Sequence, residues 1–412
     1  MGERTNLKVT LLRQPGLKIS AEVNNGVVNE VCSEGPLSPF AKPALNLFKE
    51  FVCKEKPAFA NKDYIVFSLF FPPIPSKTFS RAMWGEIKSE LTKQRNPGAA
   101  TIAVTRACAC DCIYCGYMGS YDYANELTNK ELKSIIDEVV QMGAFSVTIY
   151  GGDPILRKDV FDIIKYVKSK ECWCVLFTPA ATFTDDTAKK LKNAGLDAIF
   201  IVLHSRDSNI HDGLVQLKGA HSKAVNTIKA CLNAGLLVGV STYATTDRLN
   251  NGDIDDLIHF SEELGVHEIT VADIIPTGKL LRREDVILTV KDRERLVQLE
   301  KTYSSPNSRT PRVSTTSCMK GPTGLGCIAG KRWVYVNPHG FVTPCAYIPL
   351  TFGNVRDETL QKIWKRIRKH KIFSTNVPSC LMQNSEFRKS YIQKIPEGVI
   401  LPYPISKLES DD

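Results

Sequence analysis

The chain of 412 residues has no apolar run that reaches the roughly 18 residues needed to span a bilayer. Its first residues, MGERTNLKVTLLRQ, contain no apolar segment of the kind found in signal peptides. Position 6 is Asn, so the start also lacks the Met-Gly-x-x-x-Ser/Thr pattern of N-terminal lipidation. These absences predict a protein without a transmembrane segment and with a cytoplasmic location.

Cysteine, in contrast, is abundant, with 13 residues in the chain. Disulfides rarely persist in the cytoplasm, and an odd count also argues against a disulfide framework. The cysteines cluster in the sequence, and clustering favours metal binding. The net charge of +9 favours anionic partners such as nucleotides, nucleic acid, acidic peptides or a membrane surface, without selecting one of them.

The pattern of apolar residues divides the chain into three regions. Residues 1–97 alternate as short strands and two helices, and predict a small α+β domain. Its apolar stretch at 64–75, YIVFSLFFPPIP, has three prolines in its last four positions, which stop any regular element. This stretch either lines a channel for an apolar substrate or belongs to the core. Residues 98–282 form the central region, and residues 283–412 are richer in Cys, Gly, Pro and basic residues.

The central region alternates apolar runs with helix-like segments. Strand–helix alternation predicts a parallel α/β sheet, and strands buried on both faces read as nearly continuous apolar runs. Six units are too few for an eight-stranded barrel, which leaves a doubly wound sheet or a partial, open barrel. The six predicted strands are 101–105, 146–151, 175–179, 198–204, 238–243 and 268–274.

The first of these strands runs directly into the sequence TRACACDCIYCGY. Cys108, Cys112 and Cys115 form the pattern C-x3-C-x2-C. Three thiolates can hold three irons of a cubane cluster and leave the fourth open, as a catalytic metal needs. Zinc sites usually have two C-x2-C pairs, and only one pair occurs here. Cys110 is expected to be a bystander in the loop.

This motif resembles that of the radical S-adenosylmethionine (SAM) superfamily, which implies a partial (β/α)6 barrel for the central region, beside the small N-terminal α+β domain that the pattern predicts. The resemblance implies that the three cysteines hold a 4Fe–4S cluster and that SAM chelates its open iron. It places Tyr114 near the adenine, and the Gly151-Gly152-Asp153 segment against the amino group of the methionine part of SAM. Asp153 replaces a Glu in the family's pattern, so its shorter side chain reaches less far.

The ribose side departs from the family's pattern. The usual Ser corresponds to Leu203, so His204, Ser205 or Ser241 is the candidate for the ribose contact. An ordinary, satisfied polar group at a strand end is the alternative for each of them. The segment IIPTGK at 274–279 resembles one that closes the cofactor site.

The tail contains C-x12-G-x4-C, made by Cys327, Gly340 and Cys345. This pattern resembles the SPASM or twitch extension of many radical SAM enzymes. The turn at 337–340 would make a hairpin that brings the two cysteines together, and Cys318 and Cys380 would complete the ligand set. The C-x2-C-x5-C-x3-C block of a full SPASM domain is missing, so the resemblance implies one auxiliary 4Fe–4S cluster. A tail without a cluster, with buried thiols, is the alternative.

The expected activity is reductive cleavage of SAM to a 5′-deoxyadenosyl radical that takes hydrogen from a substrate. The resemblance favours oxidative modification of a peptide, with a ferredoxin or flavodoxin as electron donor. The alternatives are modification of a tetrapyrrole, lipid or small metabolite, and a non-catalytic iron–sulfur carrier. The basic run at 362–371 either binds phosphates or is a solvated helix face. It has no interleaved aromatic residues for base stacking, so nucleic acid is not an expected partner.

Overall fold

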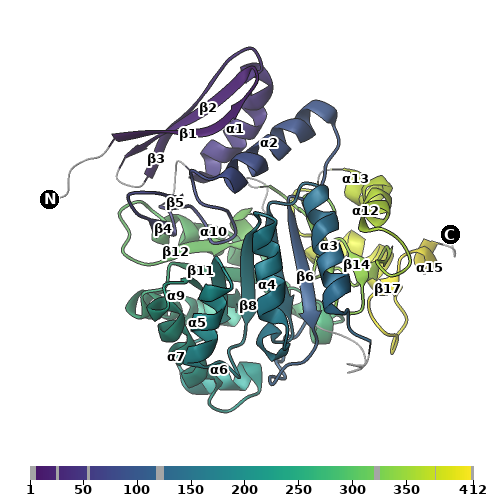
Figure 1. Cartoon of the computed structure of the whole chain (residues 1–412). Helices are drawn as coiled ribbons and strands as arrows, with labels where there is room; N and C mark the ends of the chain where they lie inside the picture. The colour runs from purple at the N-terminus through teal and green to yellow at the C-terminus, as the bar shows by residue number, and fades with distance from the viewer. Residues whose placement is uncertain are drawn as a thin grey trace.

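The computed structural model describes residues 6–24, 27–52, 56–116, 125–319, 325–375 and 377–409. The N-terminal region forms an antiparallel sheet in the order β1-β2-β3, with helices α1 and α2 packed beside it (Figure 1). The Ser76 hydroxyl caps α2 by accepting a hydrogen bond from the Phe79 amide at 3.0 Å. The elements are β1 (Asn6–Gln14), β2 (Leu17–Asn24), β3 (Val27–Glu34), α1 (Ser38–Val52), β4 (Phe59–Ala60), β5 (Ile65–Val66) and α2 (Lys77–Thr92).

The six predicted strands of the central region are all present, and they lie in the sheet in the order of the chain. A doubly wound sheet would reverse its strand order at a switch point, whereas this order is that of a partial barrel. The sheet is open, as expected. The strands are β6 (Ala99–Thr105), β7 (Ser146–Gly151), β8 (Trp173–Thr178), β9 (Ala198–Val202), β10 (Leu237–Ala244) and β11 (Glu268–Asp273).

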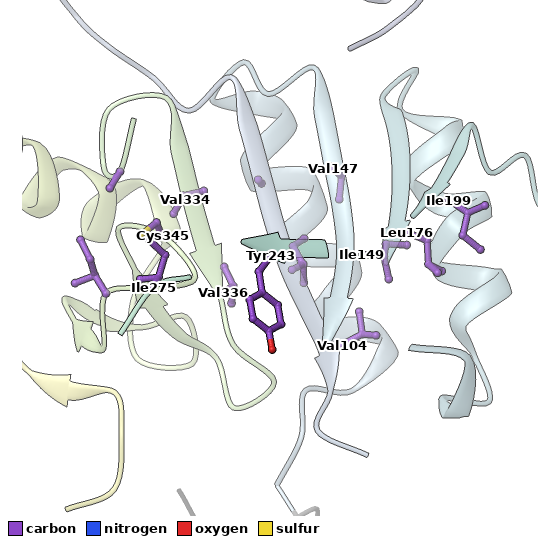
Figure 2. Packing of buried hydrophobic residues seen from close by; sticks show 14 of the residues in the cluster. Val104, Val147, Ile149, Leu176, Ile199, Tyr243, Ile275, Val334, Val336 and Cys345 are labelled. Carbon is purple, nitrogen blue, oxygen red and sulfur yellow. The ribbon is translucent and has the colours of Figure 1, made fainter. Parts of the chain in front are cut away.

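One row of helices covers the outer face of this sheet, and neighbouring helices in the row contact each other (Figure 1). The outward residues of the strands, such as Val147, Ile149 and Leu176, are buried beneath it (Figure 2). The helices that follow the strands are α3 (Asn129–Gln141), α4 (Val160–Ser169), α5 (Asp185–Asn193), α6 (Ser208–Val215), α7 (Ala220–Asn233), α8 (Thr246–Asn250) and α9 (Asp253–Leu264).

The apolar stretch at 64–75 fills part of the inner face of the sheet. Phe70 stacks on Phe200, with 4.8 Å between ring centroids, and Leu69 is fully buried. The Glu268 carboxylate holds the stretch in place by accepting hydrogen bonds from the Ser68 hydroxyl at 3.0 Å and the Leu69 amide at 2.6 Å. The segment Phe67–Phe70 therefore belongs to the core, which was one of the two alternatives.

The last region does not stand apart from the sheet. Its strand β12 (Arg312–Thr315) pairs parallel with β11, and β13 (Trp333–Val336) pairs parallel with β6. Val334 and Val336 share a hydrophobic cluster with Val104 (Figure 2). The remaining elements are α10 (Val290–Tyr303), α11 (Thr316–Met319), β14 (Phe341–Thr343), β15 (Leu350–Thr351), β16 (Gly353–Asn354), α12 (Leu360–Lys369), α13 (Lys371–Ser374), α14 (Ser385–Phe387), β17 (Tyr403–Pro404) and α15 (Ser406–Glu409).

Within the described residues the sheet thus has ten strands, because β14 and β16 continue it antiparallel beyond β13. The sequence pattern treats residues 283–412 as an extension, and the structure shows that this extension contributes strands at both edges. The boundaries at 97 and 282 stay predictions. In the part of the chain that the structure describes, none of the helices combines the length and apolar character needed to cross a membrane.

Candidate active site and auxiliary cysteine site

The cysteine loop begins at the carboxyl end of β6, where parallel α/β sheets bind their ligands. The Glu126 carboxylate holds its start, accepting hydrogen bonds from the Thr105 hydroxyl at 3.1 Å and the Arg106 amide at 2.6 Å. The Cys115 amide donates to the Cys112 carbonyl at 3.2 Å, which folds the loop into a turn. Cys108, Cys112 and Cys115 are all half-buried.

Cys110 lies between two of the predicted ligands. Its amide donates to the Cys108 sulfur at 3.4 Å. A hydrogen bond from the Cys110 thiol is the main cause that lowers the pKa of Cys108, and it lowers the pKa of Cys112 to about 7. Lys279 also lowers the pKa of Cys112 by its charge. The loop therefore favours thiolates, the form that binds iron.

Among the residues that the structure describes, no group of three His, Cys, Asp or Glu side chains has the spacing of a metal site. The assignment of Cys108, Cys112 and Cys115 as ligands rests on their spacing in one half-buried loop, in which the thiols of Cys108 and Cys112 have lowered pKa values. The chemistry of this donor set fits a cluster bound by three cysteines.

The segment after β7 is locked against the cysteine loop. The Gly152 amide donates to the Thr105 carbonyl at 2.9 Å, and the Asp153 amide donates to the Ala107 carbonyl at 2.7 Å. A Cβ atom at Gly152 would lie 2.4 Å from the Ala107 carbonyl oxygen, too close for any side chain. Glycine at this position is therefore needed to bring Asp153 beside the cysteines.

Asp153 is fully buried, and its carboxylate is half satisfied. Its Oδ1 accepts from the Thr178 hydroxyl at 2.8 Å and the Ile155 amide at 3.2 Å. Its Oδ2 has no hydrogen-bond partner among the described residues, and burial raises the pKa of this carboxyl. A buried acceptor without a partner is costly, and the ammonium group of SAM is a donor of the right charge. Asp153 therefore fits the role that the family resemblance implies.

Tyr114 lies between two aromatic side chains from the neighbouring strand ends. Its ring centroid is 4.8 Å from that of His204 and 4.3 Å from that of Tyr243. The Tyr114 hydroxyl also forms a hydrogen bond with His204 Nε2. Burial lowers the pKa of His204 and raises that of Tyr114, so both are neutral at physiological pH. His204 thus orients Tyr114.

The two serines predicted for the ribose side differ in their surroundings. The Ser205 hydroxyl is buried, donates to Asp253 Oδ1 at 2.6 Å and accepts from the Asp207 amide at 3.1 Å. It has the contacts of a satisfied strand-end group. Ser241 is half-buried on β10, where it pairs with Val202 of β9. The ribose contact of either serine stays a prediction.

Sequence reasoning missed the buried Arg248, which connects the ends of β9 and β10. It pairs with Asp253 at 2.6 Å and donates to the Thr242 hydroxyl at 3.1 Å and to the His204 carbonyl. Nothing in a single sequence distinguishes this arginine from an exposed one, because its partners lie on separate elements: Asp253 starts α9, Thr242 is on β10 and His204 follows β9. It holds the His204 end of the site rigid.

The segment after β11 closes over the cysteine loop. The Lys279 amide donates to the Cys115 carbonyl at 2.9 Å, and the Lys279 side chain pairs with Asp111. Gly278 has a φ of +60°, and a Cβ atom there would overlap the Cys115 carbonyl. The sequence indicates the segment but not this role of Lys279.

The tail cysteines gather in one cavity beside the sheet. The hairpin of β13 and β14 forms at the predicted turn. Cys327, Cys345 and Cys380 line the cavity, together with Ile328, Ala329, Trp333, Tyr347, Ile348, Leu381 and Met382. Three cysteines in an otherwise apolar cavity suit an iron–sulfur cluster. Cys318, on α11, is not among the lining residues, so its role as a ligand stays a prediction.

Comparison with known families gives two matches in this chain. Residues 102–261 match the radical SAM superfamily, and residues 327–386 match SPASM, an iron–sulfur cluster-binding domain. The first match contains the cysteine loop and the Gly151–Asp153 segment, and the second contains the auxiliary cavity.

Three individual proteins are similar to this chain over most of its length. An AdoMet-dependent heme synthase of Nitratidesulfovibrio vulgaris is 26% identical over 294 residues, 66% of this chain and 80% of that protein. A PqqA peptide cyclase of Bradyrhizobium diazoefficiens is 26% identical over 301 residues, 67% of this chain and 76% of that protein. SuiB of Streptococcus suis, crystallised with its precursor peptide SuiA, has the same fold with a TM-score of 0.59, 16% identity and 90% coverage of both chains.

These matches distinguish between the two classes of protein predicted from the sequence, an enzyme and a non-catalytic iron–sulfur carrier. They support an enzyme over a passive carrier, and they support a 4Fe–4S cluster, SAM and an auxiliary cluster as cofactors. Residues 102–261 thus form a radical SAM domain, and residues 327–386 form a C-terminal SPASM domain.

Proposed function

We propose that this enzyme oxidatively modifies a peptide. When bound, the cluster and SAM supply a 5′-deoxyadenosyl radical that takes a hydrogen atom from the substrate, and the protein provides binding and orientation. Asp153 holds the ammonium group of SAM, and Tyr114, fixed by His204, borders the adenine. The cysteines of the auxiliary cavity, Cys327, Cys345 and Cys380, would hold the second cluster.

The observation that carries the peptide proposal is the free edge of the N-terminal sheet. Strand β3 pairs with β2 on one side and with no other described strand. Proteins often bind extended peptides by adding them as a strand to such an edge. Each outer strand accepts a hydrogen bond from a helix: the Leu11 carbonyl of β1 accepts from the Ser80 hydroxyl of α2 at 2.6 Å, and the Ser33 carbonyl of β3 accepts from the Ser38 hydroxyl of α1 at 3.1 Å. The contact on β1 lies in the middle of the strand, whereas the contact on β3 lies at its end, so β3 is the more open edge. SuiB, which binds a precursor peptide, shares the fold over 90% of this chain.

Asn29 offers a way to block this edge without unfolding it. The pairing of β2 with β3 skips Asn29, because Glu22 pairs with Glu30 and Val23 with Val28. Proline is tolerated at such bulges and at edges. Asn29→Pro therefore leaves the β2–β3 ladder intact and removes one donor from the β3 edge, and Asn29→Ala is the matched control.

The experiment uses reconstituted enzyme, SAM and dithionite without oxygen, with a synthetic peptide library as substrate. We expect 5′-deoxyadenosine, and library members that lose two hydrogen atoms by mass spectrometry. Asn29→Pro should lower the yield of modified peptide, whereas Asn29→Ala should not. If both variants match the wild type, β3 is not the binding edge. If 5′-deoxyadenosine forms but no peptide changes mass, the peptide proposal is wrong.

Tetrapyrrole modification is the second candidate. It is favoured by relatives named as AdoMet-dependent heme synthases, which this chain matches over about 80% of their length at 25–27% identity. The same assay with an iron porphyrin that carries carboxylate side chains tests it. Loss of carbon dioxide from the porphyrin, with unmodified peptides, would replace the peptide proposal.

A further inference from the structure

The outer face of helix α12 carries a stripe of three lysines. Lys362, Lys365 and Lys369 are spaced i, i+3 and i+7, so they lie along one side of the helix, and all three are exposed. Within the described ranges, none of the three forms an ion pair, whereas the neighbouring Arg366 is paired with Glu358 at 2.8 Å. The helix itself contains no acidic residue. The charge of Lys362 contributes to the lowered pKa of Glu358, so this end of the stripe is partly compensated, and the stripe as a whole carries excess positive charge.

The opposite face of the same helix packs on the loop that borders the auxiliary cavity. Ile363 and Ile367 are fully buried, and Arg368 Nη1 donates to the Gly330 carbonyl at 3.2 Å. A Cβ atom at Gly330 would lie 2.6 Å from Ile367, so helix and loop are in direct contact there. Gly330 follows Ala329, which lines the cavity together with Cys327. The lysine stripe thus lies across one helix, about 10–12 Å in diameter, from the loop that borders the cysteine cavity.

The auxiliary cavity is also joined to the cysteine loop of the active site. Tyr347 lines the cavity, and its carbonyl accepts a hydrogen bond from the Thr277 hydroxyl at 2.8 Å. The next residue, Gly278, packs directly on the Cys115 carbonyl. One short segment therefore links the two cysteine sites. A partner bound at α12 would therefore lie across this helix from the loop that borders the auxiliary cavity, and the auxiliary cavity is linked in turn to the cysteine loop.

We propose that the lysine stripe of α12 is the docking surface for an acidic one-electron carrier protein. Charge complementarity steers association between such partners, and the stripe lies across α12 from the loop that borders the auxiliary cavity. Trp364 is buried, so the exposed face of α12 lacks an aromatic side chain for base stacking, which argues against nucleic acid. The transfer moves one electron: the reduced carrier is oxidised, and the iron–sulfur site that it faces is reduced. The inference rests on the proposed radical SAM function.

The test compares two triple variants of the reconstituted holoenzyme. The first is Lys362→Glu/Lys365→Glu/Lys369→Glu, and the second, Lys189→Glu/Lys229→Glu/Lys301→Glu, has the same change in net charge at exposed lysines of α5, α7 and α10. If the triple Lys→Glu variant of the stripe does not fold, the corresponding triple Lys→Gln variant replaces it. The probe is a purified flavodoxin in its hydroquinone form. Binding affinity is measured at low ionic strength, and flavin oxidation is followed by stopped-flow absorbance.

We expect the stripe variant to bind flavodoxin at least about tenfold more weakly than the control variant, and to oxidise the flavin more slowly. Dithionite-driven formation of 5′-deoxyadenosine should be unchanged, because dithionite needs no docking surface. Equal binding and equal flavin oxidation by the two variants would overturn the proposal. So would loss of RNA binding in the stripe variant without any effect on flavodoxin. Failure of the dithionite reaction in the wild type would contradict the proposed function instead, and the binding comparison would still test the docking surface.

Discussion

At the scale of single residues, neighbouring thiols of the cysteine loop differ in their pKa values. Cys108 and Cys112 have lowered pKa values mainly because the Cys110 thiol lies within hydrogen-bonding reach of both sulfurs, and the same contacts raise the pKa of Cys110. Cys110 is therefore the thiol that keeps its proton. This arrangement fits two ligands and one accessory thiol.

Replacing Cys112 by Ala should abolish the active-site cluster and with it the formation of 5′-deoxyadenosine, because two cysteines cannot hold three irons. Cys110→Ala should keep an iron content close to that of the wild type. Iron analysis and deoxyadenosine assays check both variants. Loss of about four irons per chain in Cys110→Ala would mean that Cys110 is a ligand.

Asp153→Asn should weaken SAM binding by roughly tenfold to a hundredfold, because a hydrogen bond to a charged partner contributes about 1.5–3 kcal/mol. The amide keeps the size of the side chain and can still accept from Thr178. Titration calorimetry of SAM into the reconstituted enzyme measures the change. Asp186→Asn, at an exposed position on α5 with an ion pair to Lys190, is the control, and equal affinities in the two variants would exclude Asp153 from the site.

At the scale of elements, the start of α3 connects the barrel to the SPASM region. Glu131 and Thr128 form a capping box, and the Glu131 carboxylate also pairs with Arg356 at 2.6 Å. The hydrogen bond from Arg356 is the main cause that lowers the pKa of Glu131 to about 2. Two regions more than 200 residues apart in sequence are therefore joined at one helix end.

Glu131→Gln should lower the free energy of unfolding by about 1 kcal/mol at pH 7, a value reduced for the partial exposure of the pair. A carboxyl group with a lowered pKa stabilises the fold above its unfolded pKa, and the gain is lost as the pH falls through the folded pKa. The difference from the wild type should therefore shrink between about pH 4.5 and pH 2. Urea unfolding at several pH values measures it.

The exposed Glu397, in a turn, provides the control for this pH series, since Glu397→Gln should change the unfolding free energy little at any pH. If the difference in unfolding free energy between the wild type and Glu131→Gln stays constant from pH 7 to pH 2, the charge of the Glu131 carboxylate contributes nothing to its pairing with Arg356.

At the scale of the whole molecule, the two cysteine sites lie on either side of the segment that follows β11. Cys345→Ala should reduce the iron content from about eight to about four atoms per chain, because it removes a ligand of the auxiliary cavity only. The spectrum of the active-site cluster with SAM, recorded by electron paramagnetic resonance, should be retained. An unchanged iron content would mean that the cavity holds no cluster in solution.

Much of this architecture follows from local patterns in the sequence. Apolar runs separated by capped helices predict the six central strands, because strand burial and helix capping are local properties. The spacing of Cys108, Cys112 and Cys115 indicates a cluster for the same reason, since one loop carries all three ligands. The Gly151–Asp153 segment is also readable, because it follows its strand directly.

Other features were decided by contacts between distant residues. The addition of β12 and β13 to the edges of the central sheet depends on pairing between strands that are far apart in the chain. The burial of Arg248 beneath His204, the closure of Lys279 over the Cys115 turn and the gathering of Cys380 with Cys327 and Cys345 are of the same kind. A short sequence motif reveals a site when all of its ligands lie in one loop. The second cavity and its link to the first exist only once the sheet has brought separate segments together.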